Sequence, residues 1–295
     1  ASLVGSEMCI RDSLETPRSI YPLSTISEIK EWCYHEGKTF WEYVSDCEGP
    51  EIWDYLDTVW ETMCATIQRG LNNDGVLPGG LKVARKASTY WVKSKSYTDS
   101  LSSRAKIYAY ALATSEENAS GGTVVTAPTC GSSGVMPAVL YHLSTSRNFL
   151  RIRILRALAT AGLFGNVAKT NSSISGAEVG CQGEVGVACA MAAAAACQLF
   201  GGTPSQIEYA AEMGLEHHLG LTCDPVCGLV QVPCIERNAI AAARAFDANA
   251  YATLSDGSHM VSFDKVVEVM NETGHALPSL YRETSEGGLA KRFKR

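Results

Sequence analysis

Apolar side chains recur at helical spacing along most of this sequence. After Pro50 one stripe is formed by Ile52, Leu56, Val59, Met63 and Ile67. This spacing is typical of a helix with a single buried face. We expect the helix to end at Gly70, because glycine often terminates helices. The stretch 71–95 is rich in glycine and basic residues, and we interpret it as an exposed loop.

Polar residues mark the starts of several helices. The pattern Ser/Thr-x-x-Glu/Gln, in which two side chains cap the first turn reciprocally, occurs at Thr25–Glu28, Thr39–Glu42 and Thr203–Gln206. Periodicity predicts further helices over about 100–115, from 136, and over 147–163, 204–217, 234–246 and 263–273. No strand-rich run and no alternation of strands with helices is present. We therefore predict an all-α fold, a compact multi-helix domain over residues 14–295 with glycine-rich active-site loops.

The first thirteen residues need a separate interpretation. Leu3–Ser13, with the sequence LVGSEMCIRDS, looks like the translation of a sequencing-library adapter. We predict that residues 1–13 are an artefact and exclude them, Cys9 included, from the fold prediction.

Composition narrows the class of protein. The apolar fraction is 46% and the net charge is −6, which favours neither nucleic acid nor an anionic membrane as a partner. The longest apolar run, 185–200, is shorter than the roughly 18 residues of a membrane span. The 11 cysteines are odd in number and not densely spaced, so we expect reduced thiols and a cytoplasmic protein.

Six of the cysteines fall between residues 171 and 234, in two kinds of surroundings. Cys189 and Cys197 lie in an alanine run, where we expect buried apolar packing. Cys181, Cys223 and Cys234 each lie beside glycine or proline, in loops or helix starts that often present metal ligands. The start of a helix should also favour the thiolate of Cys234. We interpret these three as a ligand set.

The spacing of this set limits the metal centre. Paired Cys-x-x-Cys motifs, which structural zinc sites usually contain, are absent. Three dispersed thiolates suit an iron–sulfur cluster with one iron open to substrate, and such an iron is a Lewis acid suited to dehydration. On spacing alone, buried or incidental cysteines are the favoured interpretation. Two loops of small residues, 127–134 (APTCGSSG) and 171–180, offer free backbone N–H groups to an anion.

Longer motifs carry a resemblance to a known family. The stretches VVTAPTCGSSGVMPAVL, SISGAEVGCQGEVGVACAMAAA and EHHLGLTCDPVCGLVQVPCIERNAIAAA resemble the catalytic, or alpha, part of the iron–sulfur-dependent bacterial L-serine dehydratases. The likeness covers about residues 24–290. It implies an oxygen-sensitive [4Fe–4S] cluster on Cys181 (VGCQG), Cys223 (LTCDP) and Cys234 (VPCIER). The implied lyase converts L-serine to pyruvate and ammonia, in amino-acid degradation and gluconeogenesis.

The resemblance also suggests roles for residues around the two loops. We expect the substrate carboxylate and amine to be held by backbone N–H groups together with Thr129, Asn171, Ser173 and Ser175. Local capping of turns is an equal alternative for each hydroxyl. Lys169 and His217 are the candidate general bases; taken alone, they are better interpreted as a plain surface lysine and a capping histidine, respectively. Glu184 either supports the cluster or merely lies in the first turn of a helix.

This sequence departs from the family pattern in three places. Many relatives have APTNGACG where this chain has APTCGSSG, which leaves the role of Cys130 open. The self-inhibiting terminal cysteine of single-chain relatives and the SSHT motif of their beta-type domain are absent. We expect a beta-type domain on another chain or upstream, and a homo- or hetero-oligomer. Open alternatives are a cluster enzyme acting on another small hydroxy amino acid and a non-catalytic helical metal-binding module. A pyridoxal-phosphate enzyme does not fit the helical pattern.

Overall fold

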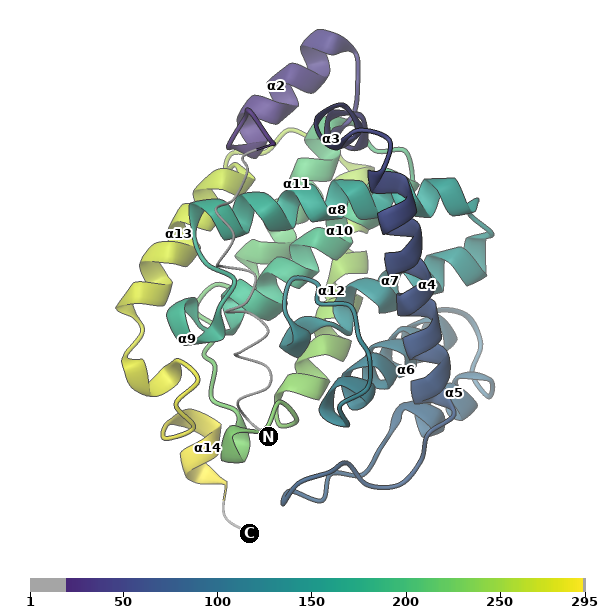
Figure 1. Ribbon diagram of the computed structural model, residues 1–295, viewed down its shortest axis with the longest axis vertical. Coiled ribbons are helices and arrows are strands. Elements are labelled where there is room, and N and C mark those ends of the chain that lie inside the picture. The colour runs from purple at the N-terminus through teal and green to yellow at the C-terminus, as the bar shows by residue number, and fades with distance from the viewer. Residues whose placement is uncertain (1–19, 294–295) are drawn as a thin grey trace.

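The computed structural model describes residues 20–293, apart from the side chain at position 99, as helices packed around one central helix (Figure 1). The central helix is α10 (Val187–Leu199). It packs against α7 (Val135–Arg147), α8 (Arg151–Asn171), α11 (Pro204–Glu216) and α12 (Cys234–Leu254). In this described part there is no β-strand, only two isolated bridges, so the predicted all-α fold is confirmed.

The remaining elements form an outer shell and a set of short turns. The outer helices are α2 (Ile26–Glu36), α3 (Phe40–Glu48), α4 (Ile52–Leu71), α5 (Ala87–Ser94), α6 (Asp99–Ala119), α13 (Phe263–Ala276) and α14 (Gly288–Arg292). The short segments are α9 (Gly176–Val179), the π-helical η2 (Gln182–Gly186), and the 3-10 turns η1 (Cys130–Ser132), η3 (Val226–Gly228) and η4 (Ser279–Tyr281). The predicted artefact, residues 1–13, lies outside the described residues.

α10 is buried on all sides because its sequence is apolar on all sides. Only Gln198 in this helix is partly exposed, and a helix without a polar face belongs in a core. Its alanines let neighbouring helices approach closely: a Cβ added at Gly214 of α11 would lie 2.9 Å from the Cα of Ala190. Cys189 and Cys197 are fully buried, as predicted. No helix between residues 20 and 293 has the length and apolar character to cross a bilayer.

Helix starts agree well with the sequence. All three predicted capping boxes are present: Thr25 with Glu28, Thr39 with Glu42, and Thr203 with Gln206. Each box satisfies backbone N–H groups that the first turn leaves without partners. Helix ends agree less well. α12 continues eight residues beyond the predicted end at 246, because Ala248 and Ala252 extend its buried face.

The predicted helix end at Gly70 is correct to within one residue, but its expected cause, termination of the helix by glycine, is wrong. α4 continues to Leu71, and Gly70 lies where α4 crosses α6. A Cβ at Gly70 would lie 2.3 Å from the backbone oxygen of Ala113. Glycine is there because two helix backbones meet, and only the partner helix reveals that reason.

The interpretation of 71–95 as an exposed loop is also partly wrong, because it contains α5. The loop before α5 is anchored on both sides. Arg85 makes an ion pair with Glu117 of α6 at 3.1 Å, and the side-chain amide of Gln231 donates to the backbone oxygen of Pro78 at 2.8 Å. Gln231 lies between Cys223 and Cys234, so this loop packs against the cysteine-bearing segment.

Candidate metal centre

Four segments that are distant in the sequence meet near the start of α10. They are residues 127–134, 171–186, 220–234 and 279–289. Helical segments η1 and η2 pack together, α12 contacts both, and α14 contacts η3. The tertiary structure therefore gathers the two small-residue loops and the cysteine motifs at one place.

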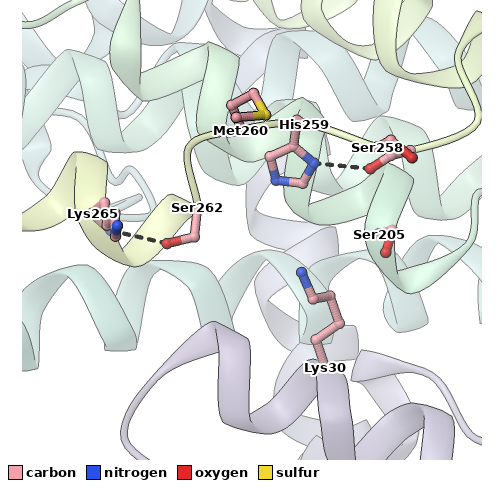
Figure 2. A pocket seen from close by; sticks show the side chains of 8 residues that line it. Lys30, Ser205, Ser258, His259, Met260, Ser262 and Lys265 are labelled. Carbon is pink, nitrogen blue, oxygen red and sulfur yellow. Dashed lines mark hydrogen bonds between the residues drawn. The ribbon is translucent and has the colours of Figure 1, made fainter.

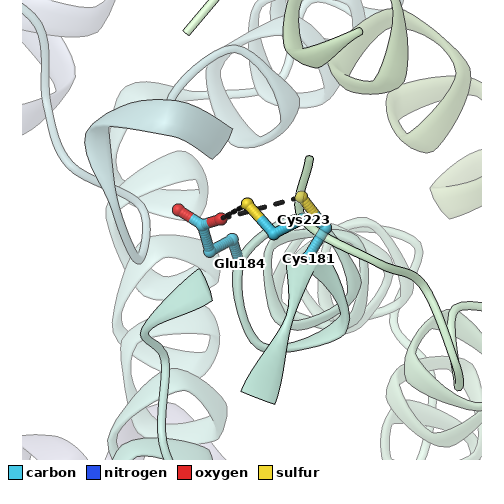
Figure 3. A group of neighbouring side chains, drawn as sticks. All are labelled: Cys181, Glu184 and Cys223. Atoms are coloured by element: carbon cyan, nitrogen blue, oxygen red, sulfur yellow. Dashed lines mark hydrogen bonds between the residues drawn. The ribbon is translucent and has the colours of Figure 1, made fainter. Parts of the chain in front are cut away.

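Cys181, Glu184 and Cys223 form a compact group at the centre of this region (Figure 3). Their donor atoms all lie within 4.8 Å of one another. The thiols of Cys181 and Cys223 donate to the same carboxylate oxygen, Oε2 of Glu184, over 3.7 and 3.6 Å. Thiolates and a carboxylate are donors that zinc and iron accept. Two of the three predicted ligands are thus close together, and both contact Glu184.

Local backbone features explain why these side chains converge. Gly180 has a φ of +76°, a left-handed conformation that directs the chain into Cys181. Glu184 lies in the π-helical turn η2, a form that is rare and frequent at functional sites. A Cβ at Gly176 would lie 2.4 Å from Glu184 Oε2 and 3.0 Å from Cys223 Sγ. A glycine at 176 therefore leaves room for the carboxylate and the thiol.

Glu184 has an unusual ionisation. Burial, followed by the neighbouring charge of Glu283, raises its pKa to about 7. Hydrogen bonds from Thr129 and the two thiols act in the opposite direction. Thr129 donates through Oγ1 to Glu184 Oε1 at 3.1 Å. This carboxyl group thus titrates close to neutral pH.

Cys234 lies in the first turn of α12, as predicted, and is buried. Asn238, one turn later, donates to the backbone oxygens of Cys234 and Gly131 at 2.8 and 2.7 Å and so ties α12 to the 127–134 loop. Burial, followed by the charge of Cys181, raises the pKa of Cys234. Burial thus opposes the effect that we expect the helix start to have on its thiolate, and that effect stays a prediction.

The segment 279–289 holds Cys223 in place. The Cys223 N–H donates to the Tyr281 carbonyl at 2.8 Å, and the Glu283 N–H donates to the Cys223 carbonyl at 2.6 Å. The buried carboxylate of the next residue, Asp224, accepts from the N–H of Leu289 and lies 3.6 Å from Arg237. A distant part of the chain therefore fixes this cysteine.

The predicted substrate-binding residues are placed differently from one another. Thr129 is buried and contacts Glu184. Ser173 and Ser175 are partly exposed, and Ser173 Oγ accepts from the Ser175 N–H at 3.1 Å. Asn171 is exposed and donates to the backbone oxygen of Ser24 at 2.9 Å. Of the four, Thr129 touches the compact group, and the substrate roles of all four stay predictions.

The two candidate bases are on the surface. Lys169 is exposed near the end of α8. The His217 ring is exposed, and its Nδ1 lies 2.9 Å from the carbonyl oxygen of Met213. Among the described contacts, neither side chain hydrogen-bonds to the compact group. Both assignments stay predictions.

Sequence inspection missed His218, the neighbour of His217. Its Nδ1–H donates to the Gly214 carbonyl at 2.7 Å, and burial lowers its pKa to about 4. The ring lies under η2, since a Cβ at Gly186 would come within 2.9 Å of His218 Cβ. The helical phase contained the signal, because position 218 is four residues after the buried Gly214.

Gln182 was also missed. It is fully buried beside Cys181 and makes four hydrogen bonds of 2.8–3.1 Å. Its amide donates to the carbonyls of Val179 and Met270, and its oxygen accepts from Gly220 N–H and Thr273 Oγ1. This side chain joins η2 to α13 and to the turn before Cys223.

A cavity of about 370 Å³ lies away from the compact group, between α2, the start of α11 and the 257–262 loop (Figure 2). Lys30 lines it and pairs with the fully buried Glu208. His259 also lines it and stacks on Tyr209 with ring centroids 4.6 Å apart. The cysteines and Glu184 do not line this cavity. Donor chemistry, and not cavity size, therefore identifies the candidate centre.

Fold and site together define an all-helical protein with a buried thiol–carboxylate group suited to a metal. A sequence model of the serine dehydratase alpha chain family matches residues 18–290. The chain belongs to this family.

Curated relatives support the same family. The chain is 52% identical to the L-serine dehydratase of Streptomyces coelicolor, with 81% of this chain and 53% of that protein aligned. It is 48% identical to L-serine dehydratase 1 of Escherichia coli (98% and 66%) and 44% identical to the L-serine dehydratase of Haemophilus influenzae (95% and 64%). The chain thus spans between about half and two thirds of the length of these relatives.

Proposed function

We propose that this chain is the catalytic alpha part of an iron–sulfur L-serine dehydratase, a lyase that converts L-serine to pyruvate and ammonia. One observation carries the proposal. Cys181 and Cys223, 42 residues apart in the sequence, lie in one buried group in a chain of this family. The names of the relatives support L-serine as the substrate.

The residues fit a [4Fe–4S] cluster by their donor chemistry. Cys181, Cys223 and Cys234 are buried thiols on three different segments, and iron–sulfur clusters are held by cysteine thiolates. The raised pKa of Cys234 responds to the charges of Cys181 and Glu184, which supports its closeness to them. We propose that these three cysteines hold the cluster.

When bound, the cluster supplies a Lewis acid for the substrate hydroxyl. The chain itself binds and orients the substrate. Backbone N–H groups of 127–134 and 171–176 receive the carboxylate, and Thr129, Asn171, Ser173 and Ser175 complete this binding surface. Glu184 lies between Thr129 and the thiols and orients both.

A general base must remove the Cα proton. Lys169 and His217 are proposed for this step, and both are exposed. A base works only within hydrogen-bond reach of the proton, and its loss typically slows the reaction by about 10²–10⁴-fold. His217→Asn and Lys169→Met, each assayed with L-serine, identify the base by a loss of this size. A variant with unchanged kcat removes its residue from this role.

We also propose the setting of the enzyme. A beta-type domain, on the same or on another chain, completes the active site, and the protein functions as a homo- or hetero-oligomer. We place the reaction in the cytoplasm, in serine degradation that delivers pyruvate for gluconeogenesis.

The proposal is tested by anaerobic reconstitution. The purified chain is incubated with iron and sulfide. Visible absorption, acid-labile sulfide, and the formation of pyruvate from L-serine and of 2-oxobutyrate from L-threonine are then measured. We expect a cluster, with pyruvate from L-serine either directly or after a beta-type domain is added. Activity should then fall on exposure to air, since an open iron is accessible to oxidants.

Three outcomes contradict parts of the proposal. Failure to form a cluster contradicts the assignment of a [4Fe–4S] cluster as the cofactor. A cluster without pyruvate, even with a beta-type domain present, contradicts the reaction. A preference for L-threonine contradicts L-serine as the substrate. The two amino acids differ by one methyl group, which a binding pocket distinguishes by only about 1–3 kcal/mol.

A further inference from the structure

We propose that the cluster-free chain binds one thiophilic divalent ion, such as Zn²⁺, through Cys181, Cys223 and Glu184. The ion would occupy the same region as the proposed cluster. The inference stands without the dehydratase activity, because it rests on the positions of three donor atoms. The inference adds two statements to the proposed function: Glu184 binds the ion, and Cys234 does not.

The separations of the donors fit a single tetrahedral ion. With zinc–sulfur bonds of about 2.3 Å and zinc–oxygen bonds of about 2.0 Å, a tetrahedral angle places sulfur and oxygen about 3.5 Å apart. Cys181 Sγ and Cys223 Sγ lie 3.7 and 3.6 Å from Glu184 Oε2. The three side chains therefore need little movement to surround one ion.

The surroundings leave the correct oxygen of Glu184 available. Oε1 accepts the hydrogen bond from Thr129, while Oε2 points at the two thiols (Figure 3). Fixing one carboxylate oxygen orients the other towards a metal. Gly176 adds no side chain between Glu184 and Cys223. Three protein ligands leave a fourth position for water, the arrangement of catalytic zinc sites.

Cys234 separates this site from the cluster. Its sulfur is not among the donors that lie within 4.8 Å of one another, whereas the proposed cluster requires it. The single ion therefore uses Glu184 without Cys234, and the cluster uses Cys234. Because both need Cys181 and Cys223, the ion should compete with cluster assembly. On binding, the two thiol protons, together with the proton of any Glu184 carboxyl group that is protonated, pass to the buffer as two metal–sulfur bonds and one metal–oxygen bond form.

Anaerobic titration of the metal-free full chain with Co²⁺ tests the proposal. Cobalt replaces zinc and reports its ligands through thiolate charge-transfer and d–d absorption bands. We expect one ion per chain, tetrahedral bands, and displacement by Zn²⁺. Glu184→Gln should weaken binding more than about tenfold, because even loss of a group behind a ligand costs about 10–100-fold. Glu184→Asp, which keeps a carboxylate, should bind better than Glu184→Gln.

Cys234→Ser is the matched control. It should bind Co²⁺ with unchanged affinity and spectrum while failing to assemble a cluster, and circular dichroism checks the fold of each variant. Unchanged binding in Glu184→Gln, or loss of binding in Cys234→Ser, overturns the proposal. Cluster formation in a chain that binds no Co²⁺ also overturns it and leaves the proposed function intact. Co²⁺ binding by a chain that assembles no cluster supports the single-ion site and contradicts the cofactor of the proposed function.

Discussion

Cys181 and Cys189 lie eight residues apart, yet their thiols have different surroundings. Cys189 lies on α10 and its thiol donates to the backbone carbonyl of Ala241 on α12, and burial raises its pKa to about 12. Cys181 shares a carboxylate with Cys223. A thiol without a polar partner other than a backbone carbonyl behaves as a small apolar side chain. One beside a second thiol and a carboxylate is a potential metal ligand.

Serine substitutions separate these two kinds of cysteine. We expect Cys181→Ser, Cys223→Ser and Cys234→Ser each to abolish cluster assembly and activity together, because a serine hydroxyl is a poor ligand for iron. Cys197→Ser should retain both, since Cys197 lies in the core away from the site. Iron and sulfide content after reconstitution are the measurements. A Cys181→Ser chain with a full cluster would exclude Cys181 as a ligand.

A second prediction at the residue scale concerns Gly176. A methyl group there would come within 2.4 Å of Glu184 Oε2, so Gly176→Ala should displace the carboxylate. We expect at least a tenfold weaker Co²⁺ affinity with helical content retained. The measurement is the titration described above, combined with far-ultraviolet circular dichroism.

Gly162→Ala is the control for this prediction. Gly162 lies within α8, and a Cβ there meets no atom within 4 Å. Removing a helical glycine without a clash stabilises a protein by about 0.4–1 kcal/mol. Metal affinity should not change. Equal affinities of the two variants would show that close packing at Gly176 does not matter to the site.

The segment 279–289, which contains η4 and the start of α14, packs on the loop that bears Cys223, and we call this segment the strap. Asp224 holds the strap in place. The Asp224 carboxylate lies against Gly288, which has a φ of +49° and where a Cβ would come within 1.9 Å of Asp224 Oδ2. Together with the backbone pairing of Cys223 to Tyr281 and Glu283, these contacts join the chain's last described turns to the centre.

Asp224→Asn should loosen this strap. The substitution removes the charge that faces Arg237 and weakens the acceptor for the Leu289 N–H. Losing one partner of a buried ion pair costs about 3–5 kcal/mol in severe cases. We expect faster amide hydrogen exchange over 279–292 and at Cys223, with α10 unchanged. Exchange that is unaltered over 279–292 would contradict the role of Asp224.

At the scale of the whole molecule, buried ionisable groups have opposing effects on how the stability of the fold depends on pH. Burial raises the pKa of Glu212 from 4.5 to about 7, so the folded chain binds the extra proton between these values. Its contribution to stability is present at low pH and is lost as pH rises through about 7. Burial lowers the pKa values of His142 and His218 from 6.5 to about 4. Their effect has the opposite sign between those values.

A difference measurement isolates the glutamate. The free energy of unfolding of the wild type minus that of Glu212→Gln should fall by about 1–3 kcal/mol between pH 5 and pH 7.5. Urea unfolding across this range measures it. Glu51→Gln, at an exposed position just before α4 and not among the charges that raise the pKa of Glu212, is the control and should show no such fall. A flat or rising difference for Glu212→Gln would contradict the buried, proton-binding state.

Local signals predicted helix starts better than helix ends. The capping boxes at Thr25, Thr39 and Thr203 need only residues within one turn, so the sequence is sufficient for them. Gly70 has a different cause, because the backbone of Ala113 on another helix excludes a side chain there. The α5 helix was missed because its short sequence has no clear apolar stripe.

Sequence alone determined the all-α class, the burial of the alanine run, the family resemblance and the three cysteines as candidate ligands. These depend on periodicity and on motifs that are contiguous in the chain. Only the tertiary structure brought Cys223 to Cys181, placed the Glu184 carboxylate against both thiols, exposed His217 while burying His218, and joined the 279–289 strap to the centre. The physical reason is that these contacts join residues far apart in the sequence. They depend on how the helices pack against one another, which a local sequence pattern does not specify.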